Sequence, residues 1–334
     1  MNIVIDKFGE IIEKNPRNDE AYFGRGNAYY LYYRDYQKAL ADYNAAIGIN
    51  PKIAEYFNNR GNAYFGLGNY QKAFSDFNRA LEIDPNFVKA LNGRGGVYLQ
   101  FQNAQEAMID FSEAISLDPQ YYDSYTLRGL AYSRENKYFE ALSDLTQAVL
   151  LKPDDPFVYT NRGGLFVLME NYEDAINDFN QAIIIDPKCI IAYEARAALF
   201  QKYYKYQESL YDYSKLLRLN KSSTGFYYGQ ISYNHFQLKE YRKALNSMNK
   251  AIKIYPESAE YYEKRGTIFF HLKNYKKALS DYDYSIGLSS NRSSVYIARA
   301  TLYDQLAYQE NDSEKKTEYQ EKAKRDYENG EKIK

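Results

Sequence analysis

Eight arginines recur along the chain at a nearly constant spacing, and a column of aspartates follows them. The arginines are Arg25, Arg60, Arg94, Arg128, Arg162, Arg196, Arg265 and Arg299, and the aspartates are Asp42, Asp76, Asp110, Asp144, Asp178, Asp212, Asp281 and Asp326. Arginines standing alone could form a basic ladder for phosphate groups, whereas arginines that each meet an acid form internal ion pairs. One segment has lost both columns together, with Ile231 and Ser247 in their places. This joint loss favours pairing, and we predict structural pairs such as Arg25–Asp42, Arg60–Asp76 and Arg128–Asp144.

Groups that commonly catalyse reactions or bind metals are scarce. His235 and His271 are the only histidines and Cys189 is the only cysteine. These counts rule out an intrachain disulfide and a cysteine zinc cluster, and they give little support to a histidine-based triad. Cys189 is expected to be a small buried apolar residue. The sequence therefore predicts a chain that is not an enzyme, with no catalytic residues, no metal and no cofactor.

The prolines show which elements must position the arginines and aspartates. Seven of the eight fall at 16, 51, 85, 119, 153, 187 and 256, spaced by 35, then four times by 34, then by 69 residues. The gap of 69 hides one missing member at Lys221. Because proline removes a backbone donor and disfavours helix at the residue before it, each Asp-Pro or Asn-Pro ends a helix. The eighth, Pro156, suits the start of a helix.

Small and bulky residues follow the same period of 34. The small column is Gly26, Gly61, Gly95, Gly129, Gly163, Ala197, Ser232, Gly266 and Ala300, and a bulky column is Tyr43, Phe77, Phe111, Leu145, Phe179, Tyr213, Met248, Tyr282 and Tyr327. Apolar or small residues at i, i+4 and i+7 make one face of a helix. Two helices approach closely only where a side chain is nearly absent. The pattern therefore predicts antiparallel helix hairpins that must stack to bury their apolar faces.

The repeat resembles the tetratricopeptide repeat, through Tyr22-x2-Arg25-Gly26-x2-Tyr29, then Ala39-x3-Tyr43, then Pro51. The resemblance covers about 19–330 as nine hairpins, and it implies an all-α, right-handed superhelical solenoid. Residues 1–17 are expected to be the second helix of a partial repeat, and 18–309 the solenoid. Residues 310–334 are expected to extend the last repeat as a charged capping helix.

In the tetratricopeptide family a second face of each first helix lines a concave groove. At 100° per residue, this face passes through two groups of candidate peptide-binding residues. The first group is polar: Asn27, Asn58, Asn62 and Asn92. The second is aromatic: Phe157, Phe226, Tyr233, Phe236 and Phe270. Amides donate to and accept from a peptide backbone, and exposed apolar patches mark binding surfaces. The alternatives are that the asparagines are surface residues without a ligand and that the aromatics pack between hairpins.

The resemblance implies a protein- or peptide-binding adaptor or scaffold that uses this groove. The alternatives are an architectural or self-assembling solenoid that binds through its ends or its convex face, and an RNA-binding helical repeat. Lys+Arg of 43 against Asp+Glu of 44 opposes nucleic-acid binding. No signal peptide or apolar stretch of 18 residues is visible, so a cytoplasmic location without membrane insertion is expected. Val4, Phe8, Ile11 and Ile12 suggest self-association through the N-terminal end.

Overall fold

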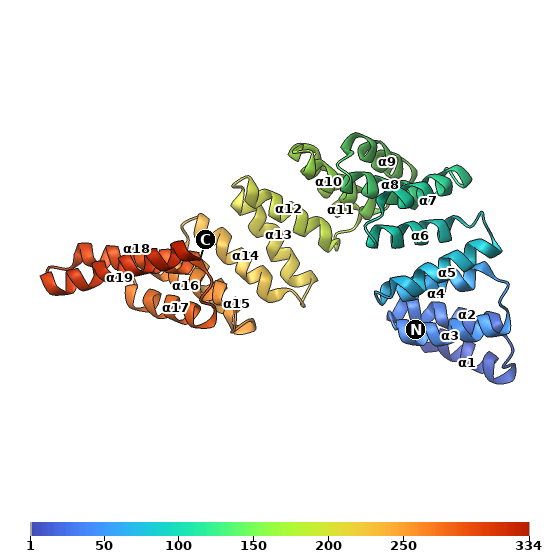
Figure 1. Ribbon diagram of the computed structural model, residues 1–334, viewed down its shortest axis with the longest axis horizontal. Helices are drawn as coiled ribbons and strands as arrows, with labels where there is room; N and C mark the ends of the chain where they lie inside the picture. Colours follow the sequence, from blue (N-terminus) through green and yellow to red (C-terminus); the bar gives the residue numbers. More distant parts are fainter. Residues whose placement is uncertain (1, 334) are drawn as a thin grey trace. The chain divides into compact units, whose positions relative to one another are not determined.

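The computed structural model describes residues 2–333, and of Asn2 only the backbone. Across these residues the chain is all-helical, with α1–α19 and one π-helical turn, η1, and no strand. The chain divides into two compact units, Met1–Ile185 and Asp186–Lys334. Within each unit, consecutive helices pair as antiparallel hairpins and each hairpin packs on the next (Figure 1). The predicted all-α solenoid of stacked hairpins is confirmed.

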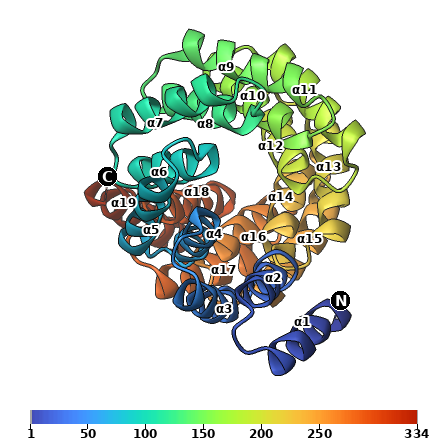
Figure 2. The ribbon, with the colours of Figure 1, turned by 90° about the vertical axis from the view of Figure 1, so that its right-hand side faces the viewer.

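The N-terminal unit contains α1 and five hairpins. Its helices are α1 (Asn2–Lys14), α2 (Asp19–Ala28), η1 (Tyr29–Tyr33), α3 (Tyr36–Ile49), α4 (Ala54–Gly66), α5 (Tyr70–Ile83), α6 (Val88–Gln100), α7 (Ala104–Leu117), α8 (Tyr122–Arg134), α9 (Tyr138–Leu151), α10 (Pro156–Leu168) and α11 (Tyr172–Ile185). The first helices α4, α6, α8 and α10 also contact one another directly. They form one layer and the second helices form the other, as Figure 2 shows for α7–α10.

The C-terminal unit contains four hairpins. Its helices are α12 (Ile190–Lys202), α13 (Tyr206–Leu219), α14 (Thr224–Gln237), α15 (Tyr241–Ile254), α16 (Ala259–His271), α17 (Tyr275–Leu288), α18 (Ser293–Gln309) and α19 (Ser313–Lys332). None of the helices in residues 2–333 has the length and apolar character needed to cross a lipid bilayer.

Local chemistry sets where these helices begin and end. Asn69 and Asn103 precede α5 and α7, and the side chain of each accepts a backbone N–H of the first turn. Such caps satisfy donors that the helix itself cannot pair. At the other end, Asp84 and Asp118 adopt extended conformations and stop α5 and α7 just before a proline. The 34-residue spacing of the prolines is therefore the spacing between the ends of successive second helices.

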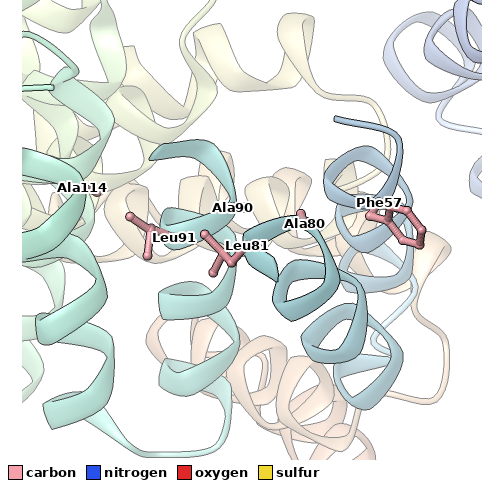
Figure 3. Close-up of a cluster of buried hydrophobic side chains, with 6 residues drawn as sticks. All are labelled: Phe57, Ala80, Leu81, Ala90, Leu91 and Ala114. Carbon is pink, nitrogen blue, oxygen red and sulfur yellow. The ribbon is translucent and has the colours of Figure 1, made fainter. Parts of the chain in front are cut away.

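The small and bulky columns meet inside each hairpin. A Cβ atom placed on Gly163 of α10 would lie 2.7 Å from a ring carbon of Phe179 on α11, and one on Gly95 of α6 would lie 2.5 Å from Phe111 on α7. Neighbouring hairpins bury a second set of apolar side chains between them. Figure 3 shows one such cluster, with Phe57, Ala80, Leu81, Ala90, Leu91 and Ala114 contributed by α4–α7. This packing fixes the spacing of the first helices.

Three departures from the 34-residue period have local structural solutions. The extra residue between Pro16 and Pro51 is accommodated by the π-helical turn η1, just before the turn to α3. The extra residue before α14 lengthens that helix to 14 residues, one more than α12. The insertion in the last hairpin extends α18 to 17 residues and α19 to 20. Each insertion changes a helix length and leaves the hairpin pattern intact.

Candidate functional site

Each arginine of the periodic column lies against the aspartate of the same hairpin. Arg128 Nε donates to Asp144 Oδ2 at 2.7 Å, and Arg128 Nη2 donates to Oδ1 at 2.8 Å. The same two-bond geometry joins the pairs Arg25–Asp42, Arg60–Asp76, Arg94–Asp110, Arg162–Asp178, Arg196–Asp212, Arg265–Asp281 and Arg299–Asp326. The bond to Asp144 raises the pKa of the Arg128 guanidinium. The Nε and Nη2 groups of each arginine already bind an aspartate and are not available to a phosphate. The structure therefore favours internal ion pairs over a phosphate-binding ladder.

A third contact of these arginines was not foreseen from the sequence. Arg60 Nη1 donates to Asn44 Oδ1 at 2.8 Å, and Arg94 Nη1 donates to Asn78 Oδ1 at 3.0 Å. Asn44 and Asn78 lie on the second helix of the preceding hairpin. Each of these guanidinium groups therefore joins two hairpins. In the sequence, the polar residue two positions after each aspartate could have indicated this contact between hairpins.

The asparagines of the N-terminal unit form part of a hydrogen-bonded chain. Tyr43 Oη and Asn59 Nδ2 both donate to Asn27 Oδ1, at 2.8 and 2.9 Å, and Asn58 Nδ2 donates to Asn59 Oδ1 at 2.9 Å. Asn58 is only 1% exposed. These hydrogen bonds join α2 to α4, so Asn58 lies in the contact between first helices and not on an open surface.

The other two candidate asparagines differ in burial. Asn92 is 7% exposed, and its Nδ2 donates to Ser124 Oγ on α8 at 2.8 Å. The Oδ1 atoms of Asn58 and Asn92 have no hydrogen-bond partner among residues 2–333. Asn62 is half-buried and lies between them on α4. Asn27 and Asn62 are thus the candidates whose side chains retain exposed surface.

Two neighbouring cavities follow this layer of first helices. Cavity A has a volume of about 230 Å³ and is lined by Asn27, Tyr30, Leu31, Tyr43, Asn58, Asn59, Asn62 and Lys89. Cavity B has a volume of about 350 Å³ and is lined by Asn62, Phe65, Phe77, Lys89, Asn92, Gly93, Gly96, Tyr121, Asp123, Thr126 and Leu127. Asn62 and Lys89 line both cavities, so A and B adjoin across α4 and α6. All four predicted asparagines line one or both of them.

Cavity B contains an acid whose environment disfavours its charge. Burial is the main cause of the raised pKa of Asp123, while the nearby hydroxyl groups of Tyr121 and Tyr122 act in the opposite direction. Burial also raises the pKa of Tyr121 to about 12. Asp123, Tyr121 and Lys89 were not among the predicted site residues, although Lys89 lies about one turn before Asn92 on α6 and Asp123 occupies the equivalent position on α8, 34 residues later.

The aromatic candidates fall into two groups. Phe157 in the N-terminal unit and Phe226 in the C-terminal unit are 54% and 45% exposed. Tyr233, Phe236 and Phe270 are half-buried. Phe236 lies 5.5 Å from Tyr241 and Phe270 lies 5.9 Å from Tyr275, measured between ring centroids. Tyr233 and Phe236 also line cavity C, of about 200 Å³, with Ser232, Gln237, Met248, Glu263, Lys264, Thr267 and Ile268.

A column of tyrosines explains the half-buried aromatics. Tyr36, Tyr70, Tyr241 and Tyr275 each begin a second helix, and each packs on an aromatic residue near the end of the first helix: Tyr30, Phe65, Phe236 and Phe270. Aromatic pairs of this kind stabilise helix contacts beyond simple burial. Phe236 and Phe270 therefore contribute to the hairpin core, and only part of each ring borders the groove.

Comparison with known protein families matches the tetratricopeptide repeat along most of the chain. Models described as tetratricopeptide or TPR repeats match residues 35–68, 54–87, 88–121, 122–155, 158–189 and 231–292. The chain belongs to the tetratricopeptide repeat family. A comparison with curated protein sequences gives no significant match.

Solved structures with a similar fold include other tetratricopeptide proteins. The APC/C hetero-tetramer Cut9–Hcn1 is 16% identical over 87% of this chain and 57% of that chain, with a TM-score of 0.56. A thermophilic TPR protein of Thermus thermophilus, TTC0263, is 18% identical over 55% of this chain and 99% of that chain, with a TM-score of 0.52. YrrB, a TPR protein with an unusual peptide-binding site, is 23% identical over 57% of this chain and 97% of that chain, with a TM-score of 0.41. These identities show the fold alone. Membership of the tetratricopeptide family supports a protein-interaction scaffold.

Proposed function

We propose that the chain is a non-catalytic scaffold that holds an extended segment of another protein along the first helices α2, α4, α6 and α8. The observation that carries this proposal is the continuity of cavities A and B. They share Asn62 and Lys89, and together they are lined by residues from each of these four helices, which belong to one compact unit. A partner that follows the helices would meet both cavities in succession.

The chemistry of the two cavities suits a peptide. Their walls combine aromatic and aliphatic side chains with a few polar groups, which is typical of binding sites that orient a flexible ligand. Asn62 presents an amide that can pair with backbone N–H and C=O groups, and Asn27 can donate from Nδ2 while its Oδ1 accepts from Tyr43 and Asn59. Exposed Lys89 and half-buried Asp123 add charges of opposite sign that can fix the direction in which a segment binds.

The proposal is tested by a substitution that fills both cavities. Asn62→Phe places a large ring where the cavities adjoin, and the side chain of Asn62 makes no hydrogen bond within residues 2–333 that this change would break. Phe139→Ala is the control, because Phe139 is 80% exposed on the second helix α9. Proteins captured from a lysate by the wild-type chain would be compared by mass spectrometry after circular dichroism has shown intact helices. Loss of partners with Asn62→Phe and retention with Phe139→Ala supports groove binding; the opposite pattern refutes it.

A second candidate function, an architectural role through the layer of second helices, rests on exposed apolar residues there. Leu150, Ile184 and Phe139 are 70%, 71% and 80% exposed. Partners lost with Phe139→Ala but kept with Asn62→Phe would favour this role. Self-association through α1, where Ile3 is 66% exposed, is a separate version of it. Light scattering that shows a monomer at high protein concentration would count against that version.

A further inference from the structure

Cavity B has an unpaired acid on one wall. Asp123 is half-buried, and no Lys, Arg or His side chain among residues 2–333 lies within ion-pair distance of its carboxylate. Lys89 also lines the cavity, but its side chain is exposed and forms no ion pair with Asp123. A carboxylate held partly away from water gains from a charge-assisted hydrogen bond with a cation.

A second wall of cavity B carries a hydrogen-bond acceptor, Asn92 Oδ1, that has no donor. Asn92 lines the cavity and is 7% exposed, its Nδ2 is committed to Ser124 Oγ, and its Oδ1 has no partner among the described residues. A buried acceptor without a donor is unfavourable. Asp123 and Asn92 both offer hydrogen-bond acceptors, so a ligand group that carries several N–H donors would suit both residues.

Part of the remaining lining of cavity B is apolar. Phe65 and Leu127 are half-buried and line the cavity, and an aromatic face attracts cations as well as methylene groups. The space depends on two glycines of α6. A Cβ on Gly96 would meet only Phe65, at 3.9 Å, so a side chain there would extend into space that is now empty. A Cβ on Gly93 would lie 2.4 Å from the ring of Phe77.

We propose that cavity B is a specificity subsite for an arginine side chain of the bound segment, whose guanidinium donates to Asp123 and Asn92. The aliphatic part of that side chain packs against the aromatic wall. Arginine fits better than lysine because its five N–H groups form a fixed fork that can serve two acceptors. Glutamate and aspartate are disfavoured, because their carboxylates would face that of Asp123. This inference rests on the proposed function, since it names what the groove recognises.

The test begins with a random peptide library displayed on phage and selected on the purified full-length chain. Peptides that bind are expected to share one arginine position. A synthetic peptide from this set, its Arg→citrulline form and its Arg→Glu form would be titrated by fluorescence anisotropy. Citrulline keeps the shape and some N–H groups but removes the charge. We expect about tenfold or more weaker binding for Arg→citrulline, and weaker binding still for Arg→Glu.

Variants of the chain assign the effect to cavity B. Asp123→Asn and Gly96→Leu are expected to weaken the arginine peptide about tenfold or more, and Lys89→Ala to strengthen it. Glu55→Gln is the matched control, because Glu55 occupies the same groove position on α4 but lies outside cavity B. Circular dichroism would first establish that each variant keeps its helices.

The outcomes separate the two proposals. Selected peptides with no shared basic position, or an Asp123→Asn effect no larger than that of Glu55→Gln, overturn the arginine subsite and leave groove binding standing. Arginine peptides that bind Gly96→Leu as tightly as the wild type also overturn it. A library that yields no binding peptide counts against the proposed function and overturns the arginine subsite with it.

Discussion

Removing Asp144 should destabilise the fourth hairpin strongly. Its side chain is 7% exposed and that of Arg128 is 20% exposed, and two hydrogen bonds join them at 2.7 and 2.8 Å. Breaking a fully buried pair costs about 3–5 kcal/mol, and breaking an exposed pair costs about 0–1 kcal/mol. Arg128 keeps some contact with water and its bond to Ser112 Oγ at 3.1 Å. We therefore expect Asp144→Ala to lower the free energy of unfolding by about 2–4 kcal/mol.

The assay must resolve one hairpin in a chain of two compact units. Urea unfolding followed by circular dichroism gives the overall change, and hydrogen exchange of peptides from α8 and α9 localises it. Asp154→Ala is the control, since Asp154 pairs with Lys152 on the surface, with side chains 74% and 42% exposed. The control should change stability far less than Asp144→Ala does, because water screens an exposed pair. A loss below about 0.5 kcal/mol for Asp144→Ala would refute the reasoning.

Three further predictions concern glycines, turns and tyrosines. Gly163→Ala should lower the free energy of unfolding by about 1–3 kcal/mol, because its Cβ would lie 2.7 Å from Phe179. The adjacent Gly164→Ala should raise it by about 0.5–1 kcal/mol, because a Cβ there would meet open space. Equal urea midpoints for the two variants would contradict this prediction. Glu170 has a φ of 59° at the turn where Gly68 has 73°, so Glu170→Gly should stabilise by a few tenths to about 1 kcal/mol and Gly68→Ala should destabilise by about 1 kcal/mol, as thermal melts would show. Chiefly burial raises the pKa of Tyr56, Tyr227 and Tyr282 to about 12. The contribution of these tyrosines to the free energy of unfolding is therefore complete below pH of about 10 and is lost as pH rises toward about 12. A urea midpoint that stays constant over this range, while absorbance at 295 nm shows tyrosine ionisation, would contradict this prediction.

The hairpins could be predicted because their determinants are local and repeated. Proline position, capping residues and the apolar period each act within one or two helical turns. The contact between Gly163 and Phe179 follows from the small and bulky columns alone. The pairing of Arg128 with Asp144 could also be argued, because both residues are absent together from one hairpin.

The groove was harder to predict because one helix face has two uses. A residue placed at the groove azimuth by 100° per residue can instead lie in the contact with the next first helix. Asn92 does so through Ser124, and Asn58 does so through Asn59 and Asn27. Which use applies depends on the angle and distance between neighbouring first helices, and those are set by packing that no single repeat encodes.

The seventh hairpin shows what the arginine–aspartate pairs contribute. There Ile231 and Ser247 are buried, at 6% and 9% exposed, and α14 and α15 still form the same hairpin. A buried pair costs about as much to desolvate as it returns, so two uncharged residues can replace both members without leaving a buried charge. Replacing only one leaves a buried charge, which explains why the two columns are lost together. The pair is therefore dispensable as a source of stability. Its distinctive contribution elsewhere is geometric, because Arg60 Nη1 and Arg94 Nη1 reach the preceding hairpin and hold their own hairpins against it. In the seventh hairpin, where Ile231 offers no such bond, Asn234 of α14 makes the connection instead: its Nδ2 donates to Ser209 Oγ on α13 at 2.9 Å, and its Oδ1 accepts from Gln201 Nε2 on α12 at 2.8 Å.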